Sequence, residues 1–293
     1  MWRNGLSGKV LVAVLLALTA ISASWSFYAD NNFVRTRITS VPVEALPSGF
    51  DGYRILHISD LHGRRFGREQ KRLAGVVRSS GVDAVVFTGD FLDRESPDLR
   101  PIAELMRVLP EGTPFVYVLG NSDVGQLSSS LADTLASRGT DVSERPVVIK
   151  RGGASLAFTS MTYDKSDQSA LQTVATADVV VALTHEQPSS LDSAVLDSEM
   201  RGVFKATAAP STDPNAIGRP SASPLPTLVD FDLLLAGHTH GGQFRLPLLG
   251  ALYAPGLGFL PPADRVQGLR TEGGRAQFVS TGLGATSTEG FGS

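Results

Sequence analysis

The stretch Leu233-Leu234-Leu235-Ala236-Gly237-His238-Thr239-His240-Gly241-Gly242-Gln243 joins a short apolar run to two histidines set among glycines. The run 233–236 predicts a buried strand. Packing does not account for two histidines at a strand end, and in an extended segment residues i and i+2 point the same way. We therefore expect His238 and His240 to face one small volume, which the glycines leave open to a metal ion or a phosphate.

Four other β-rich runs also end in polar side chains. The runs are 54–59, 85–88, 115–119 and 179–183, and the groups that follow them are Asp60, His62, Asp90, Asn121 and His185. In open α/β sheets, ligands collect at the carboxyl ends of the strands. We therefore expect five strand ends to converge on one site.

The converging groups are two carboxylates, one amide oxygen and four imidazoles, in a chain without cysteine. This mixture suits Mn²⁺, Fe or Zn²⁺ better than Ca²⁺ or Mg²⁺, which prefer shells of oxygen alone. Seven groups are too many for one ion and suit two ions that share a carboxylate. The remaining histidine, His57, lies inside its strand, where we expect a hydrogen-bonded core residue.

The ordered blocks resemble the calcineurin-like metallophosphoesterase superfamily. The blocks are Asp60-Leu61-His62, Gly89-Asp90, Gly120-Asn121, His185 and Gly237-His238-Thr239-His240. The extension Gly241-Gly242-Gln243 resembles a membrane-associated bacterial branch that includes UDP-diacylglucosamine hydrolases. Alternating strands and helices followed by strand-rich segments fit an α/β fold of two packed mixed β-sheets flanked by helices. The resemblance implies the four-layer αββα sandwich of this superfamily.

The resemblance also implies a role for each matching residue. One metal ion would be held by Asp60, His62 and His240, and the second by Asn121, His185 and His238, with Asp90 bridging them. Two divalent ions, Mn²⁺ or else Fe or Zn²⁺, would share a bridging hydroxide that attacks phosphorus. The implied activity is hydrolysis of a phosphodiester or pyrophosphate bond, with catalytic roles for Asp90, Asn121, His238 and Asp123.

The third block departs from the superfamily pattern. Relatives carry Gly-Asn-His-Asp or Gly-Asn-His-Glu, whereas this chain has Gly120-Asn121-Ser122-Asp123. The histidine of relatives lies near the leaving group, and general acid catalysis contributes about 100–10,000-fold. A serine hydroxyl is too weak an acid to replace it, although Asp123 would orient an imidazole placed at 122. The alternative to an enzyme is a metal-binding module with weak or no catalysis.

The N-terminus predicts a membrane anchor. Residues 10–29 carry no charge, and a helix of that length spans roughly 30 Å, the thickness of a bilayer core. Arg3 and Lys9 precede it, which favours a cytoplasmic N-terminus and an extracytoplasmic catalytic domain. The predicted parts are a tail (1–9), a transmembrane signal anchor (10–29), a tether with an edge strand (30–49) and the phosphoesterase domain (50–293). Cleavage near the small residues 22–24 is the alternative.

Composition fits one large domain. The chain has 293 residues, of which 42% are hydrophobic and 19% charged, and its net charge is -3. This balance argues against a nucleic-acid surface. We expect a single-pass protein of the bacterial cytoplasmic membrane, monomeric, acting on a phosphorylated substrate that is lipid-linked or a small molecule.

Several other segments carry expectations. Helices are predicted over 68–78, 99–108 and 124–137, a hairpin over 147–150 and 154–159, and an edge strand over 33–38. The proline-rich segment 205–226 predicts a surface insertion or a lid. The loop 255–262 is apolar and fits either an acyl groove or ordinary packing, and Arg64 and Arg65 are either phosphate ligands or a solvated pair.

Overall fold

The fold is seen in a computed structural model. It describes residues 4–95, 97–124, 126, 128–163, 167–192, 194–196, 198, 227–242, 244–246 and 250–283; within these, the side chains of 4–7, 22–23, 25–32 and 244–246 are not described. The predicted insertion at 205–226 lies outside the described residues.

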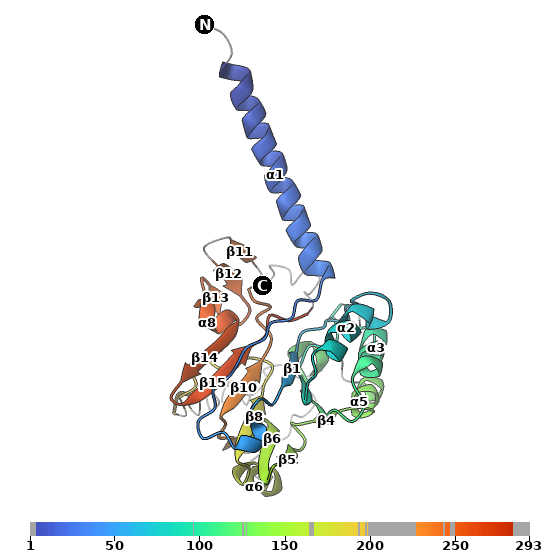
Figure 1. The fold of residues 1–293 in the computed structure, drawn as a ribbon, viewed down its shortest axis with the longest axis vertical. Coiled ribbons are helices and arrows are strands. Elements are labelled where there is room, and N and C mark those ends of the chain that lie inside the picture. Colours follow the sequence, from blue (N-terminus) through green and yellow to red (C-terminus); the bar gives the residue numbers. More distant parts are fainter. Residues whose placement is uncertain are drawn as a thin grey trace, which may run out of the picture.

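Two sheets form the centre of the molecule (Figure 1). The first has the order β1-β2-β3-β4, with β1 Ile55–Ile58, β2 Ala84–Thr88, β3 Phe115–Val118 and β4 Thr140–Asp141. The second has the order β14-β15-β10-β8-β6-β5, with β5 Val147–Arg151, β6 Ala154–Ser160, β8 Val179–Leu183, β10 Leu233–Ala236, β14 Gly268–Glu272 and β15 Arg275–Val279. All pairs in the first sheet are parallel, and the second sheet is mixed.

The two sheets pack face to face. Val86 and Val116 of the first sheet share one apolar cluster with Phe158, Val181 and Leu235 of the second. Because successive side chains in a strand point to opposite faces, the residues that alternate with them enter two outer clusters instead.

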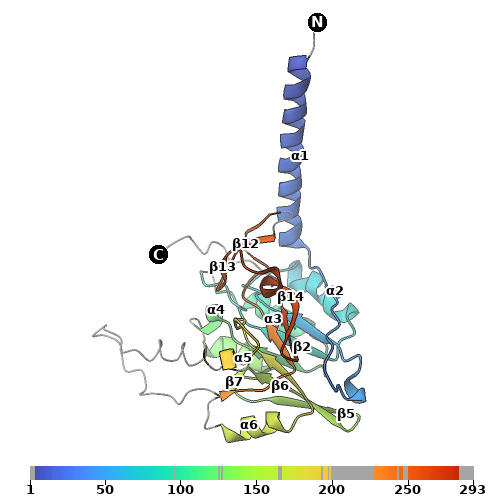
Figure 2. The same ribbon diagram turned by 90° about the vertical axis from the view of Figure 1, so that its left-hand side faces the viewer.

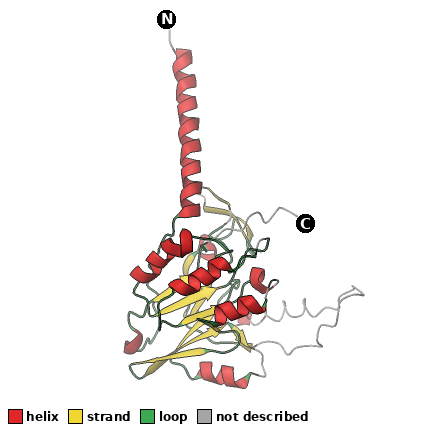
Figure 3. Ribbon diagram, turned by 90° about the vertical axis from the view of Figure 1, so that its right-hand side faces the viewer, coloured by secondary structure: helices red, strands yellow, loops and turns green. Residues whose placement is uncertain are grey.

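Helices cover both outer faces, so the molecule has four layers (Figure 3). On the first sheet lie α2 Lys71–Ser79, α3 Arg100–Val108 and α5 Ser129–Ala136, and on the second lies α6 Gln168–Ala175. The shorter helices are η1 Ser48–Phe50, η2 Arg68–Gln70, α4 Asn121–Val124 and α8 Ala263–Val266. Two small antiparallel sheets pair β7 Thr162–Tyr163 with β9 Thr227–Leu228, and β11 Phe244–Leu246 with β12 Gly250–Ala254 and β13 Gly258–Phe259.

Most predicted elements of the domain are confirmed, and three details are wrong. The first sheet is wholly parallel rather than mixed. The segment 33–38 is not a strand; its Phe33 lies under the Arg72 guanidinium, and Ile38 is 93% exposed. The helix predicted over 124–137 is divided, because Ser128 caps α5 by accepting a hydrogen bond from the Leu131 N–H at 3.3 Å.

The chain begins with the helix α1, Asn4–Asn32, which projects from the domain (Figures 1 and 2). Its apolar side chains between Val10 and Ile21 are about half to two-thirds exposed. Among the described residues, no helix combines the length and the apolar character needed to cross a membrane. The transmembrane helix predicted over 10–29 is therefore not found there, and part of that range lies outside the described side chains.

Candidate metal centre

The candidate site lies beyond the ends of β1, β2, β3, β8 and β10. Backbone pairing continues past the first two strands, since the Asp60 N–H donates to the Gly89 carbonyl at 2.9 Å and the His62 N–H to the Asp90 carbonyl at 3.0 Å. In the second sheet, the Gly237 N–H donates to the His185 carbonyl at 3.0 Å. These bonds fix the loops that carry the polar side chains.

Five of the predicted ligands have left-handed backbone. The φ angles are 52° for Asp60, 45° for His62, 60° for Asp90, 72° for His238 and 52° for His240. Residues with a side chain rarely adopt this region, and such strain concentrates at functional sites. Strand alternation is therefore the wrong reason for the direction of His238 and His240, because both follow β10 in a turn rather than in an extended segment.

Glycine permits the close approach of two of these loops. A methyl group on Gly89 would lie 2.5 Å from the Gly120 nitrogen, and one on Gly120 would overlap Asp90 Oδ1. Any side chain at either position would push the loops apart. The Gly-Asp and Gly-Asn pairs of the sequence thus bring the second and third strand ends into contact.

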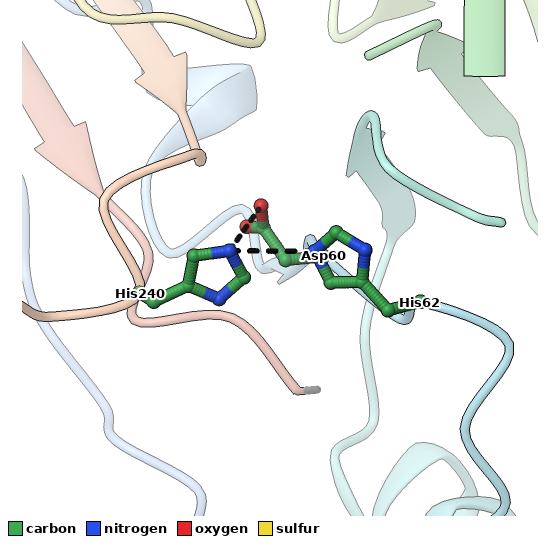
Figure 4. Close-up of side chains that lie close together, drawn as sticks. All are labelled: Asp60, His62 and His240. Carbon is green, nitrogen blue, oxygen red and sulfur yellow. Dashed lines mark hydrogen bonds and ion pairs between the residues drawn. The ribbon is translucent and has the colours of Figure 1, made fainter. Parts of the chain in front are cut away.

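Asp60, His62 and His240 form what we call the inner half-site (Figure 4). The Nε2 atoms of His62 and His240 lie 3.3 Å apart, and His240 Nε2 lies 3.7 Å from Asp60 Oδ1. The side chains of Asp60 and His62 are almost completely buried. Asp60 is further fixed because its carboxylate accepts the His238 N–H at 3.1 Å.

Asn121, His185 and His238 form what we call the outer half-site. His185 Nε2 lies 3.0 Å from Asn121 Oδ1 and 3.2 Å from His238 Nδ1. Asp90 stands between the half-sites, with Oδ2 at 3.4 Å from His185 Nε2 and 3.6 Å from His62 Nε2. The structure thus brings all seven predicted ligands together around Asp90.

The donor set fits metal ions because its lone pairs face one another. Asn121 Oδ1 lies 3.3 Å from both carboxylate oxygens of Asp90, and none of these atoms carries a hydrogen. Turning the amide would relieve this contact, but it would turn away the only atom of Asn121 that can hold a cation. The Nε2 atoms of His62 and His240 face each other at 3.3 Å and either share a proton or, in the tautomer that leaves both lone pairs free, can hold a cation. Divalent cations would satisfy both arrangements.

Proton affinities differ between the two half-sites. Burial lowers the pKa of His185, but the hydrogen bond and charge of Asp90 outweigh it and raise the pKa to about 9. Burial raises the pKa of Asp90, and its bond to His185 outweighs this effect, so the pKa lies well below its usual range. Burial, with the charge of His240, lowers the pKa of His62.

A carbonyl outside the ligand set orients His185. His185 Nδ1 lies 2.7 Å from the Thr88 carbonyl oxygen, which accepts its proton. In the neutral ring this leaves the Nε2 lone pair directed at Asp90 and Asn121. Such partners fix the tautomer of a metal-binding histidine.

Asp123 and Ser122 stabilise the loops and the carboxylate of the site by hydrogen bonds. The Asp123 carboxylate accepts the backbone N–H groups of Asp90, Leu92 and Gly120 at 2.8, 2.9 and 2.9 Å. Burial raises its pKa to about 6. Asp123 thus joins the two loops, and the expectation that it would orient an imidazole placed at 122 stays a prediction.

Two other expectations concern cationic side chains and His57. Arg65 forms a two-pronged salt bridge to Glu104, at 3.0 and 2.8 Å, so it is a structural residue. Burial lowers the pKa of Arg64. His57 is outside the cluster as predicted: its Nε2 lies 2.8 Å from Thr88 Oγ1, and burial lowers its pKa to about 3.

Arg94 is a neighbour of the site that the sequence did not single out. It lies in the loop after β2, and its guanidinium faces the side-chain amide of Asn121, whose oxygen would accept from it only if the amide were turned. Its position in the sequence indicated little, because a cationic residue four positions after an aspartate is common on protein surfaces. Only the fold shows that this loop meets α4.

The fold and the ligand cluster define a metal-dependent phosphoesterase, and a family model agrees with this class. The model for calcineurin-like phosphoesterases matches residues 53–242. This chain belongs to that family, whose members usually bind divalent metal ions.

Relatives agree with the family. The uncharacterized metallophosphoesterase YkuE of Bacillus subtilis (strain 168) is 26% identical over 97% of this chain and 91% of its own length. The phosphodiesterase YaeI of Escherichia coli (strain K12) is 25% identical over 80% of this chain and 76% of its own. Among solved structures, TT1561 of Thermus thermophilus is 14% identical over 79% of this chain and 90% of its own, with a TM-score of 0.44.

Proposed function

We propose that this protein hydrolyses a phosphodiester or pyrophosphate bond with two divalent metal ions, Mn²⁺ being the first candidate. The observation that carries the proposal is the convergence of possible metal-ligand atoms around Asp90, where carboxylate, amide oxygen and imidazole nitrogen atoms lie 3.0–3.6 Å apart. Two half-sites that share one carboxylate match a pair of ions. When bound, the ions supply Lewis acidity that activates water and offsets charge on a phosphoryl group.

The chain's own residues prepare this chemistry. Ser122 donates its backbone N–H and its hydroxyl to the two Asp90 oxygens at 2.9 and 3.0 Å, which fixes the shared carboxylate. Asp123 joins the loops after β2 and β3. Charges held in this way need little rearrangement as the reaction proceeds, which is how preorganised sites lower barriers.

The proposed substrate is lipid-linked, and the proposed place is the surface of the cytoplasmic membrane, on the extracytoplasmic side. Support comes from the exposed apolar side chains of α1 and from the β12–β13 hairpin, where Phe259 and Leu260 are 78% and 72% exposed. This hairpin lies at the same end of the domain as the base of α1 (Figures 1 and 2). A methyl group on its Gly256 would lie 3.7 Å from His238 Nε2, so the hairpin also adjoins the outer half-site.

Turnover tests the enzymatic proposal. The purified full chain, freed of metal and resupplied with Mn²⁺, is expected to release p-nitrophenol from bis-(p-nitrophenyl) phosphate. Removal of the metal by a chelator should stop release, and added Mn²⁺ should restore it. A metal-binding module, the alternative that Ser122 suggests, would bind Mn²⁺ without release.

A separate label tests the lipid surface. The chain has no cysteine, so Phe259→Cys carries an environment-sensitive dye at one known place. Its fluorescence should shift to the blue with anionic phospholipid vesicles. Lys150→Cys is the control, because β5 lies at the end of the domain away from α1 (Figures 1 and 2). Equal responses from both labels would contradict the proposed surface.

A further inference from the structure

Positive charge gathers at the beginning of α2. The stretch 64–78 holds a single acidic residue, Glu69, although the net charge of the whole chain is -3. Its cationic residues are Arg64, Arg65, Arg68, Lys71, Arg72 and Arg78. Three of them, Arg68, Lys71 and Arg72, are exposed and lie within five positions of the sequence. We call these three side chains the basic face.

The stability of α2 does not account for the basic face. The N-terminus of a helix carries a partial positive charge, so cations there are unfavourable and acids are favourable. The first turn of α2 begins with Lys71 and Arg72 and contains no acid. Among the residues that the structure describes, no salt bridge neutralises Arg68 or Lys71, in contrast to Arg65, which pairs with Glu104. The charge therefore remains available to an anionic partner.

The basic face lies beside the end of α1. Phe33 directly follows this helix, and the Arg72 guanidinium lies over its ring, at 5.8 Å from the ring centre. Figures 1 and 2 show α2 at the end of the domain from which α1 projects, where the β12–β13 hairpin also lies. The hairpin exposes Phe259 and Leu260. Cations next to exposed apolar side chains are typical of surfaces that meet a membrane interface.

We propose that the basic face binds the headgroups of anionic phospholipids and so turns the metal centre toward the bilayer. A chain of net negative charge is repelled by an anionic membrane unless it turns a basic surface to it. The metal centre belongs to the same end of the domain, because Gly256 of the hairpin adjoins His238 and a short loop joins His62 to α2. The orientation of the centre rests on the proposed function, whereas the lipid contact stands without it.

Vesicles of two compositions test the lipid contact. Cosedimentation at limiting lipid should show that the full chain binds vesicles with phosphatidylglycerol more tightly than vesicles of phosphatidylcholine alone. Arg68→Gln with Lys71→Gln should reduce this preference roughly tenfold, because each cation near an anionic surface adds to binding. At about 1 M salt, where the Debye length is about 3 Å, the preference should disappear. Arg107→Gln with Lys150→Gln removes two exposed cations elsewhere and is the matched control, which should keep the preference.

A label on α2 keeps the test valid even where α1 alone holds the chain on both kinds of vesicle. Gly75 lies one turn after Lys71, and a Cβ atom added there meets no other atom within 4 Å. Gly75→Cys therefore carries a fluorophore beside the basic face. Spin labels on lipid headgroups should quench it more in phosphatidylglycerol vesicles, and Arg68→Gln with Lys71→Gln should remove the difference.

The outcomes separate the lipid contact from the enzymatic function. Equal binding and equal quenching in the two lipids would overturn the proposal, as would the same losses in the control variant. Preference for an oligonucleotide over phosphatidylglycerol would overturn it in favour of a nucleic-acid surface. Turnover of bis-(p-nitrophenyl) phosphate in detergent should be the same in Arg68→Gln with Lys71→Gln as in the wild type. A wild type that binds phosphatidylglycerol through the basic face without turnover would refute the enzymatic function and leave the lipid contact.

Discussion

The inner and outer half-sites use the same kinds of ligand in different surroundings. In the inner half-site, Asp60 and His62 are almost fully buried, and burial lowers the pKa of His62. In the outer half-site, Asn121 is exposed and the charge of Asp90 raises the pKa of His185. His62 thus meets little competition from protons, whereas His185 loses a proton before it binds a metal ion. The two half-sites therefore differ in how strongly protons compete with a metal ion, at His62 and at His185.

Substitution of the shared carboxylate, Asp90, is the most direct test of two half-sites that hold two ions. Asp90→Asn should lower metal-dependent turnover by roughly 100-fold or more, because a neutral amide cannot offset two neighbouring dications. Elemental analysis and the bis-(p-nitrophenyl) phosphate assay measure the loss. His57→Gln is the control and should keep its metal, since His57 bonds to Thr88 outside the cluster. A variant at Asp90 with both metals and near-full turnover would refute a dinuclear site.

The pH dependence of metal affinity should also distinguish the two half-sites, because protons compete with metal ions for histidine nitrogens. Metal binds the neutral imidazole, so a raised pKa at His185 means that affinity at the outer half-site should increase with pH until about pH 9. The slope should approach a factor of about ten per pH unit, for one proton displaced. The inner half-site should show little slope above neutral pH, since the pKa of His62 is lowered.

Calorimetric Mn²⁺ titrations between neutral pH and about pH 9 measure both slopes. His185→Ala should remove the Mn²⁺ binding step whose affinity depends on pH and keep the binding step at the inner half-site. His240→Ala, which changes the inner half-site instead, should leave the pH-dependent event in place. Two Mn²⁺ binding steps whose affinities depend equally on pH would show that the half-sites do not differ in proton competition.

The ligand set could be predicted because each ligand follows an apolar run that can be recognised as a strand from the sequence. The runs 179–183 and 233–236 became β8 and β10 with the predicted bounds. Their ends converge because parallel strands present the same end to one edge of the sheet. The resemblance of the five blocks then supplied the pairing of ligands, which the spacing of residues does not contain.

Other features depend on contacts that sequence patterns do not record. The left-handed φ angles of His238 and His240 arise from the turn after β10, so strand alternation could not direct their rings. Asp123 could not be recognised as a clamp, because its three N–H partners come from two loops that are distant in sequence. Arg94 meets Asn121 for the same reason.

The clamp should affect stability more than chemistry. Asp123→Asn replaces one acceptor oxygen by a donor that faces backbone N–H groups, so we expect the free energy of unfolding to fall by about 2 kcal/mol. Urea denaturation of the metal-free protein measures it. Asp133→Asn, at an exposed position of α5, is the control and should change stability little. Equal, small changes would mean that Asp123 does not join the loops.

Ser122→His should have the smallest effect, and the structure explains why. General acid catalysis is worth up to about 100–10,000-fold, but here the new ring would enter a buried position and remove the hydrogen bond of the Ser122 hydroxyl to Asp90. Asp123 already accepts backbone N–H groups there. We expect a gain well below that range, confined to alkoxide leaving groups, which need a proton. Aryl and phosphate leaving groups should gain less, because they are stable as anions and need little protonation. The ratio of the two rates is the quantity to measure, with Ser122→Ala as the control for loss of the hydroxyl alone. A large, equal gain for every leaving group would show that the histidine acts on Asp90 and the outer half-site rather than on the departing oxygen.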